Sequence, residues 1–149
     1  MLVTLGVYAA CTAGAPQAAS AKGPDSARST WQLSLTVDGG LAGTAQQFTA
    51  DDTSKALVFI DMTRGTRTVV ALTDDEQQGL AALVASRPGA PDTDDRTPTC
   101  ADCFRYEMKI DHLKKIRLAR YDSMTMADSP DAALIMRVIE IGRKGLTNR

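Results

Sequence analysis

Apolar and polar residues alternate strictly along Trp31–Val37, which predicts a β-strand with one buried face. Five further segments have the alternation or the composition of strands. The six predicted strands comprise residues 31–37, 44–50, 55–62, 66–72, 104–110 and 115–121. Short turns join the first four, and Gly65 supplies a residue that tolerates positive φ between the third and the fourth. This order predicts antiparallel neighbours.

The same alternation predicts which side chains of the last two strands face the core. In the fifth strand the inward set is Phe104, Tyr106, Met108 and Ile110. In the sixth strand we expect Ile116 and Leu118 to point inward, and Lys115 and Arg117 to point outward.

Two segments have the signals of amphipathic helices. Thr73 and Glu76 have the spacing of a capping box, so we expect a helix over residues 74–86. Ser129 as N-cap, followed by Pro130, predicts the start of a second helix with a wide apolar stripe. The order ββββ-α-ββ-α predicts an α+β fold, in which two helices cover one face of an antiparallel sheet of about six strands.

The N-terminal residues have a different composition. Residues 1–10 are uncharged and mostly apolar, and Cys11 follows two small residues, as in the lipobox of bacterial lipoproteins. There the cysteine becomes the lipidated first residue of the mature protein. Cleavage after Ala19 or Ala21, which would give a secreted protein, and a structural N-terminal helix are the alternatives.

We therefore divide the chain into three parts. Residues 1–21 are the predicted signal segment, 22–29 a flexible tether rich in small and polar residues, and 30–147 a single α+β domain. The predicted location is the cell envelope, with Cys11 anchored by lipid to the membrane on the exported side, or alternatively outside the cell.

Charge and composition argue against several classes of function. The 149 residues carry a net charge of −1, so no overall basic field attracts nucleic acid. Aromatic residues make up 5%, which is few for stacking on bases. No apolar run reaches the roughly 18–20 residues of a membrane-spanning helix. We expect a monomer.

Cysteine usage fits export. With Cys11 lipidated, Cys100 and Cys103 remain as a pair, and the predicted state is a local structural disulfide. A redox centre, half of a zinc site and free thiols are the alternatives. Redox pairs of this spacing usually begin a helix, whereas this pair precedes a strand. A zinc site needs more ligands, and the only histidine is His112.

The titratable clusters are each explained without catalysis. His112 is expected in a solvated turn. One acidic group suits a helix N-terminus and comprises Asp74, Asp75 and Glu76. A second suits a solvated loop more than a calcium site and comprises Asp92, Asp94 and Asp95. We therefore predict no catalytic residues, no metal and no cofactor.

A basic cluster precedes and occupies the last predicted strand. Its members are Lys114, Lys115, Arg117 and Arg120. Strand alternation divides them between the two faces, so a solvated face with cross-strand pairs to Glu107 is expected. A surface for anionic lipid headgroups or for an acidic partner is the alternative.

The sharpest predicted turn joins the first two strands. It comprises Gly39, Gly40, Leu41, Ala42 and Gly43. No GK[ST] follows and no helix begins there, so the segment is not a phosphate-binding loop. It is interpreted either as a tight hairpin turn or as a protruding loop whose bare backbone approaches a partner.

Four motifs, in order, resemble the emfourin-like proteins, the family of protealysin inhibitors. Gly39–Gly43 after a strand resembles the family's GGFAG turn, and the helix at 74–86 is similar to its first helix. Asp102–Met108 is similar to a D-x-F-x-Y-x-aliphatic strand, and Ser129–Ile141 resembles the closing helix. The resemblance covers about Trp31–Leu146.

This resemblance implies a non-enzymatic protein that inhibits thermolysin-like metalloproteases of the M4 class, secreted or in the envelope. It also makes the glycine turn the candidate contact with the partner. Leu41 stands where the family usually has phenylalanine, and the hairpin over 55–72 is an insertion. The alternatives are a structural or ligand-binding envelope lipoprotein and a CxxC thiol protein.

Overall fold

The computed structural model describes residues 30–87, 100 and 102–147. The described elements are β1 (Trp31–Gly39), β2 (Thr44–Asp51), β3 (Ala56–Asp61), β4 (Thr66–Ala71), α1 (Asp74–Ala85), β5 (Phe104–His112), β6 (Lys115–Asp122) and α2 (Ala132–Thr147). The predicted α+β fold, with an antiparallel six-stranded sheet and two helices, is confirmed.

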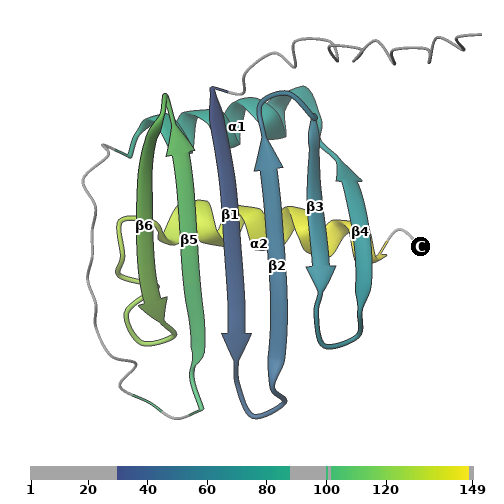
Figure 1. Ribbon diagram of the computed structural model, residues 1–149, viewed down its shortest axis with the longest axis vertical. Coiled ribbons are helices and arrows are strands. Elements are labelled where there is room, and N and C mark those ends of the chain that lie inside the picture. Colours follow the sequence, from purple (N-terminus) through teal and green to yellow (C-terminus); the bar gives the residue numbers. More distant parts are fainter. Residues whose placement is uncertain (1–29, 88–99, 101, 148–149) are drawn as a thin grey trace, which may run out of the picture.

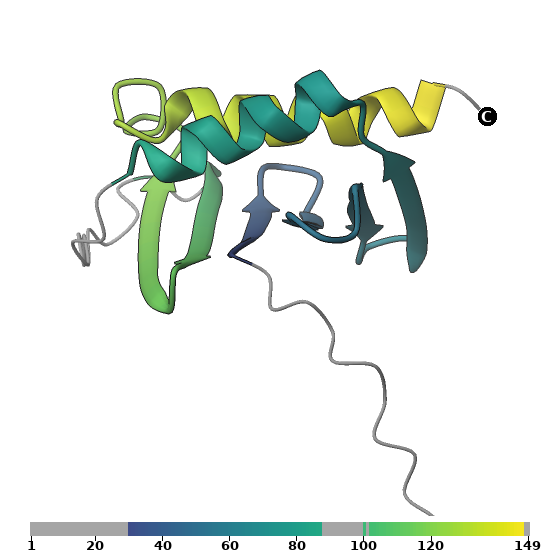
Figure 2. The ribbon, with the colours of Figure 1, turned by 90° about the horizontal axis from the view of Figure 1, so that it is seen from above.

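The strands form one sheet in the order β4-β3-β2-β1-β5-β6, and every neighbouring pair is antiparallel (Figure 1). Both helices lie on the same face and run across the strands (Figure 2). Helix α1 carries the chain from the β4 edge towards β5, and α2 returns from the β6 edge to β4. The one long connection between strands, from β4 to β5, therefore contains α1, hairpins join the other consecutive strands, and α2 follows the last strand.

The core lies between the sheet and the helices. Leu35 of β1 pairs with Phe48 of β2 on one side and with Met108 of β5 on the other, and all three are buried. The apolar stripe of α2 packs on this layer. Its buried members include Leu134, Ile135, Val138 and Ile141. Phe48 is the largest fully buried side chain among the described residues.

The helices leave one end of this sheet face uncovered. In Figure 1, α1 lies behind the upper ends of the strands and α2 behind their middle. At the lower end, Phe104 is on the helix-bearing face by register but remains 38% exposed, and Tyr106 is half-buried. Phe104 therefore faces the predicted side of the sheet but is not buried, because no helix covers it.

The capping box of α1 is confirmed. The Thr73 hydroxyl accepts from the Glu76 N–H, and the Glu76 carboxylate accepts from the Thr73 N–H. The same carboxylate binds Lys144 of α2, with 2.8 Å between Nζ and Oε1. Hydrogen bonding from Lys144 lowers the pKa of Glu76 below its ordinary value. This pair joins the start of α1 to the end of α2.

The face prediction for β6 is wrong by one residue. Arg117 is buried at 7% exposure opposite Ile110, whereas Ile116 is 59% exposed. The inward residues are Arg117, Ala119 and Tyr121. The physical reason is a carboxylate inside the fold, Asp131, which holds the Arg117 guanidinium. A shift of one residue turns every side chain to the other face.

The start of α2 also differs from the prediction. The helix begins at Ala132, and the Asp131 carbonyl accepts its first bond, from the Ile135 N–H at 3.0 Å. The Ser129 hydroxyl has no hydrogen-bond partner among the described residues. Asp131 is fully buried and turned towards Arg117.

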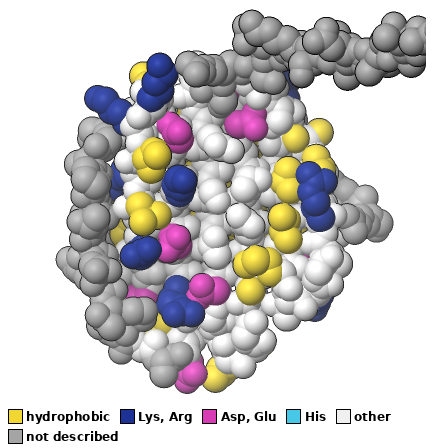
Figure 3. Space-filling view, in the orientation of Figure 1, with side chains coloured by type: hydrophobic (Ala, Val, Ile, Leu, Met, Phe, Trp, Pro, Cys, Tyr) yellow, Lys and Arg dark blue, Asp and Glu magenta, His cyan; other side chains and the backbone are white. Residues whose placement is uncertain are grey.

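The opposite face of the sheet carries no helix and is polar over its centre (Figure 3). Two cross-strand ion pairs lie on it, with Nε–O distances of 2.6 Å for Arg105–Asp38 and 2.9 Å for Arg120–Glu107. The predicted pairing of this cluster with Glu107 is thus made by Arg120.

No helix within the described ranges is long and apolar enough to cross a membrane.

Candidate functional site

The glycine turn has the backbone that its sequence predicts. Gly39, Gly40 and Gly43 all have positive φ, at 103°, 71° and 60°. The Gly43 N–H donates to the Gly40 carbonyl at 3.0 Å and closes the turn. Leu41 stands at the tip with 91% of its surface exposed. The turn therefore presents one leucine side chain at the end of the sheet.

The structure brings the turn against the cysteine segment. The Gly40 N–H donates to the Cys103 carbonyl at 3.4 Å, and a Cβ on Gly39 would collide with that carbonyl. The Phe104 ring lies over Gly40, because a Cβ there would be 2.8 Å from the ring. Glycine is required at both positions, for φ and for the close approach.

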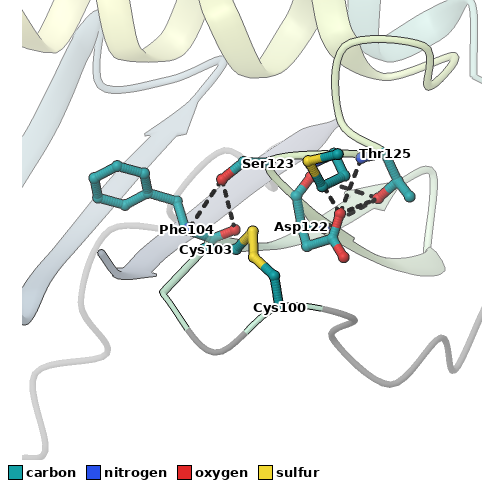
Figure 4. Close-up of a disulfide and its surroundings, with 7 residues drawn as sticks. Cys100, Cys103, Phe104, Asp122, Ser123 and Thr125 are labelled. Atoms are coloured by element: carbon teal, nitrogen blue, oxygen red, sulfur yellow. Dashed lines mark hydrogen bonds between the residues drawn. A yellow bond between two sulfur atoms is a disulfide. The ribbon is translucent and has the colours of Figure 1, made fainter. Parts of the chain in front are cut away.

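A disulfide joins Cys100 to Cys103 directly before β5 (Figure 4). Ser123 fastens the residue that follows it, since its hydroxyl accepts from the Phe104 N–H at 2.9 Å and donates to the Phe104 carbonyl at 3.3 Å. The Asp122 carboxylate orders the neighbouring loop by accepting hydrogen bonds from the N–H groups of Met124 and Thr125. The Cys103–Phe104 segment, which supports the glycine turn, is thus held by a disulfide and by hydrogen bonds.

Besides Met62, which follows β3, three large apolar side chains are exposed at this end of the sheet (Figure 1). They are Leu41, Phe104 and Met124, exposed by 91%, 38% and 70%. Met124 lies in the loop after β6, next to Ser123. An apolar tip on a well-held loop suits contact with an apolar pocket of a partner, because little conformational freedom is lost on binding. We refer to these three residues with Gly39–Gly43 as the glycine-turn end.

A buried polar cluster lies elsewhere and was not predicted from the sequence. The Asp131 carboxylate accepts two hydrogen bonds from Arg117, at 2.8 and 2.7 Å, and one from the Tyr121 hydroxyl at 2.6 Å. Arg87, at the end of α1, places Nε 3.4 Å from Asp131 Oδ1. Burial, and then the bond to Asp131, raises the pKa of Tyr121 to about 12.

The cluster joins both helices to β6. The pKa of Arg117 is raised by its hydrogen bonds to Asp131, so the guanidinium stays charged. One sequence signal could have found it: an aspartate between a proline and an apolar stripe, together with an arginine at an inward position of the strand before it. That signal needs the sheet register, which the sequence leaves open.

Several predicted residues are placed apart from the glycine-turn end. His112 ends β5, and the turn itself is made by Leu113 and Lys114. Asp74 pairs with Lys55, at 3.0 Å between Oδ1 and Nζ. Cys11 and the three acidic residues of the 88–99 segment lie outside the described residues.

Comparison of the chain with protein-family models, curated proteins and solved structures gives no match. Within the described part of the chain, no three His, Cys, Asp or Glu side chains converge on a point that could hold a metal ion.

Proposed function

We propose that this protein is an exported, lipid-anchored binding module without catalytic activity, and that it inhibits a thermolysin-like metalloprotease through its glycine-turn end. One observation carries the proposal. Leu41, fully presented at the tip of the turn, is held in place by backbone contact between Gly40 and Cys103.

The geometry favours binding with little reorganisation. A loop that is closed by its own hydrogen bond and supported by a disulfide loses less entropy on binding than a free loop. An exposed large apolar side chain is costly in water and becomes a binding anchor when a partner desolvates it. Both properties are those of an inhibitor that inserts one side chain into a protease cleft.

The resemblance to emfourin-like proteins supports the choice of partner. The turn that presents Leu41 is the first of the four motifs, and the Cys103–Phe104 segment that supports it belongs to the third. Two motifs far apart in the sequence thus meet at one surface. A surface that combines them is the one we assign to the protease.

Titration of the purified chain against several thermolysin-like proteases tests the proposal. We expect stoichiometric loss of peptidase activity, and we expect Leu41→Asp to weaken inhibition at least tenfold. Leu113→Asp is the matched control, because it places the same charge on an exposed turn leucine at the other end of the sheet. Full activity of every protease at micromolar excess of the chain would refute inhibition. Equal inhibition by the two variants would refute the role of Leu41.

The lipid anchor has a separate test. Labelled palmitate should enter the protein in its native host, and the variant Cys11→Ser should take up none. Label that persists in the variant contradicts attachment at Cys11. Alkylation followed by mass spectrometry tests the disulfide: a protein with alkylated Cys100 and Cys103 would instead support a thiol function.

A structural or ligand-binding role in the envelope is the second candidate. It is favoured by exposed apolar residues on the helix-free face of the sheet, among them Val69 on β4 and Ile116 on β6 (Figure 3). Pull-down from envelope extracts with the purified chain separates the two roles. Recovery of a protein without peptidase activity, blocked by Ile116→Asp and not by Leu41→Asp, supports the second.

A further inference from the structure

A small pocket lies at the end of the sheet opposite the glycine turn. Its volume is about 30 Å³. The lining residues are Arg87, which follows α1, Ile110 and His112 of β5, and Lys115 and Arg117 of β6. A water molecule needs roughly 10–15 Å³ of such space, so the pocket admits about two oxygen atoms of a larger anion, whose other atoms would lie at its mouth. Four of the five lining side chains carry nitrogen donors.

The charges around the pocket do not cancel. Two arginines and one lysine face it, while one carboxylate, that of Asp131, stands behind the arginines. Arg117 uses both terminal nitrogens on Asp131. The group therefore keeps two positive charges even with His112 neutral. A cation-rich hollow of this size favours a compact dianion.

Arg87 supplies the second observation. Its Nε is buried and has no hydrogen bond within the described part of the chain, although it lies 3.4 Å from Asp131 Oδ1. A buried donor without a partner is destabilising, because it has lost its hydrogen bonds to water. A ligand oxygen in the pocket offers the hydrogen-bond partner that this Nε–H lacks. Guanidinium groups match the oxygens of phosphate in spacing and in charge.

We infer that Arg87, His112, Lys115 and Arg117 form a binding site for one phosphate group. The site lies at the end where the described domain begins: His112 pairs with Trp31, and the Leu113 N–H donates to the Thr30 carbonyl at 2.9 Å. The phosphate therefore comes either from solution or from a lipid headgroup at a membrane to which the chain is anchored. Only the second source depends on the proposed anchor.

Calorimetric titration of the full chain with inorganic phosphate tests the site, using Cys11→Ser throughout so that no lipid is attached. Ionic strength is held constant with chloride. We expect saturable binding of one phosphate, and at least a tenfold loss of affinity in Lys115→Gln and in Arg87→Gln. Arg67→Gln is the matched control, because Arg67 is exposed on β4 and lies outside the pocket. Its affinity should equal that of the parent.

Sedimentation with vesicles identifies the source. Retention by phosphatidylglycerol vesicles, absent with phosphatidylcholine and displaced by inorganic phosphate, assigns the site to a headgroup. Phosphate binding without retention assigns it to free phosphate. Absence of phosphate binding, or equal affinity in Lys115→Gln and Arg67→Gln, overturns the site. Neither result affects the protease test, because protease inhibition is measured without phosphate.

Discussion

Among the substitutions that replace one carboxylate oxygen by nitrogen, Asp131→Asn should lower the stability of the domain the most. Asp131 is fully buried and binds Arg117 through both carboxylate oxygens. Asparagine has the same shape but no charge, and one of its two terminal atoms is a donor. At least one donor of Arg117 or Tyr121 then faces another donor.

The expected loss follows from the charge that remains. Two unit charges about 4 Å apart contribute about 4 kcal/mol at an effective dielectric constant of 20. Breaking a buried pair by removing one partner costs about 3–5 kcal/mol, because the other charge stays buried without compensation. Domains of this size unfold with about 5–15 kcal/mol in total, so the Asp131→Asn protein should fold but be strongly destabilised.

Urea unfolding gives the measurement. Trp31 is the only tryptophan and is buried, so its fluorescence reports the transition. Arg120→Gln breaks an ion pair whose partners are both about half exposed, and it should cost at most about 1 kcal/mol. The double variant Arg117→Met with Asp131→Leu removes both buried charges and should recover most of the stability lost in Asp131→Asn.

Two results would contradict this reasoning. A loss in Asp131→Asn no larger than that in Arg120→Gln would mean that the buried pair contributes little. A double variant as unstable as Asp131→Asn would mean that the loss comes from the start of α2, or from Arg87 and Tyr121, which also lose Asp131, and not from the Arg117 guanidinium.

Three further predictions follow from local geometry. Leu113 and Lys114 both have positive φ in the two-residue β5–β6 turn. Replacing them by Asn-Gly should therefore raise the free energy of unfolding by about 1 kcal/mol. No gain in urea unfolding would contradict this. A Cβ on Gly142 would lie 2.5 Å from a buried phenylalanine ring of β2, so Gly142→Ala should lower the thermal midpoint, whereas Gly79→Ala, in open space on α1, should raise it. Because the pKa of Glu76 is lowered in the folded state, its carboxylate contributes stability that is present above pH 4.5 and is lost as the pH falls through the lower folded-state value. Glu76→Gln should therefore make the loss of stability at acid pH less steep. An unchanged loss would contradict the assignment.

The strands were predictable because six to nine residues are enough to show the period or the composition of a strand. The alternation of Trp31–Val37 has a single interpretation, and its buried face is the predicted one. In β6 the same rule fails, because an arginine counts as polar wherever it points. Arg117 is buried only because Asp131, fourteen positions along the chain, reaches it from the start of α2. Side-chain alternation within one segment contains no information about such a partner.

The glycine turn was predictable and its surroundings were not. Positive φ at Gly39 and Gly40 follows from residue type and from the strands on each side. Their contact with Cys103 follows from the pairing of β1 with β5, which brings Gly39 opposite Phe104. Several strand orders satisfy the same alternation, so this neighbourhood required the sheet topology.

The direction of β1 relates the two proposed sites to each other. The strand begins at Trp31, beside the basic pocket, and ends at the glycine turn. Its nine residues, at about 3.3 Å each, separate the sites by roughly 30 Å. An anchor before Thr30 would then hold the pocket towards the membrane and Leu41 away from it, towards a partner in the surrounding space. Sites so far apart, at opposite ends of a six-stranded sheet, should not compete. Saturating phosphate should therefore leave the inhibition constant for a metalloprotease unchanged once ionic strength is matched, and a tenfold change in it would show that the two ends are coupled.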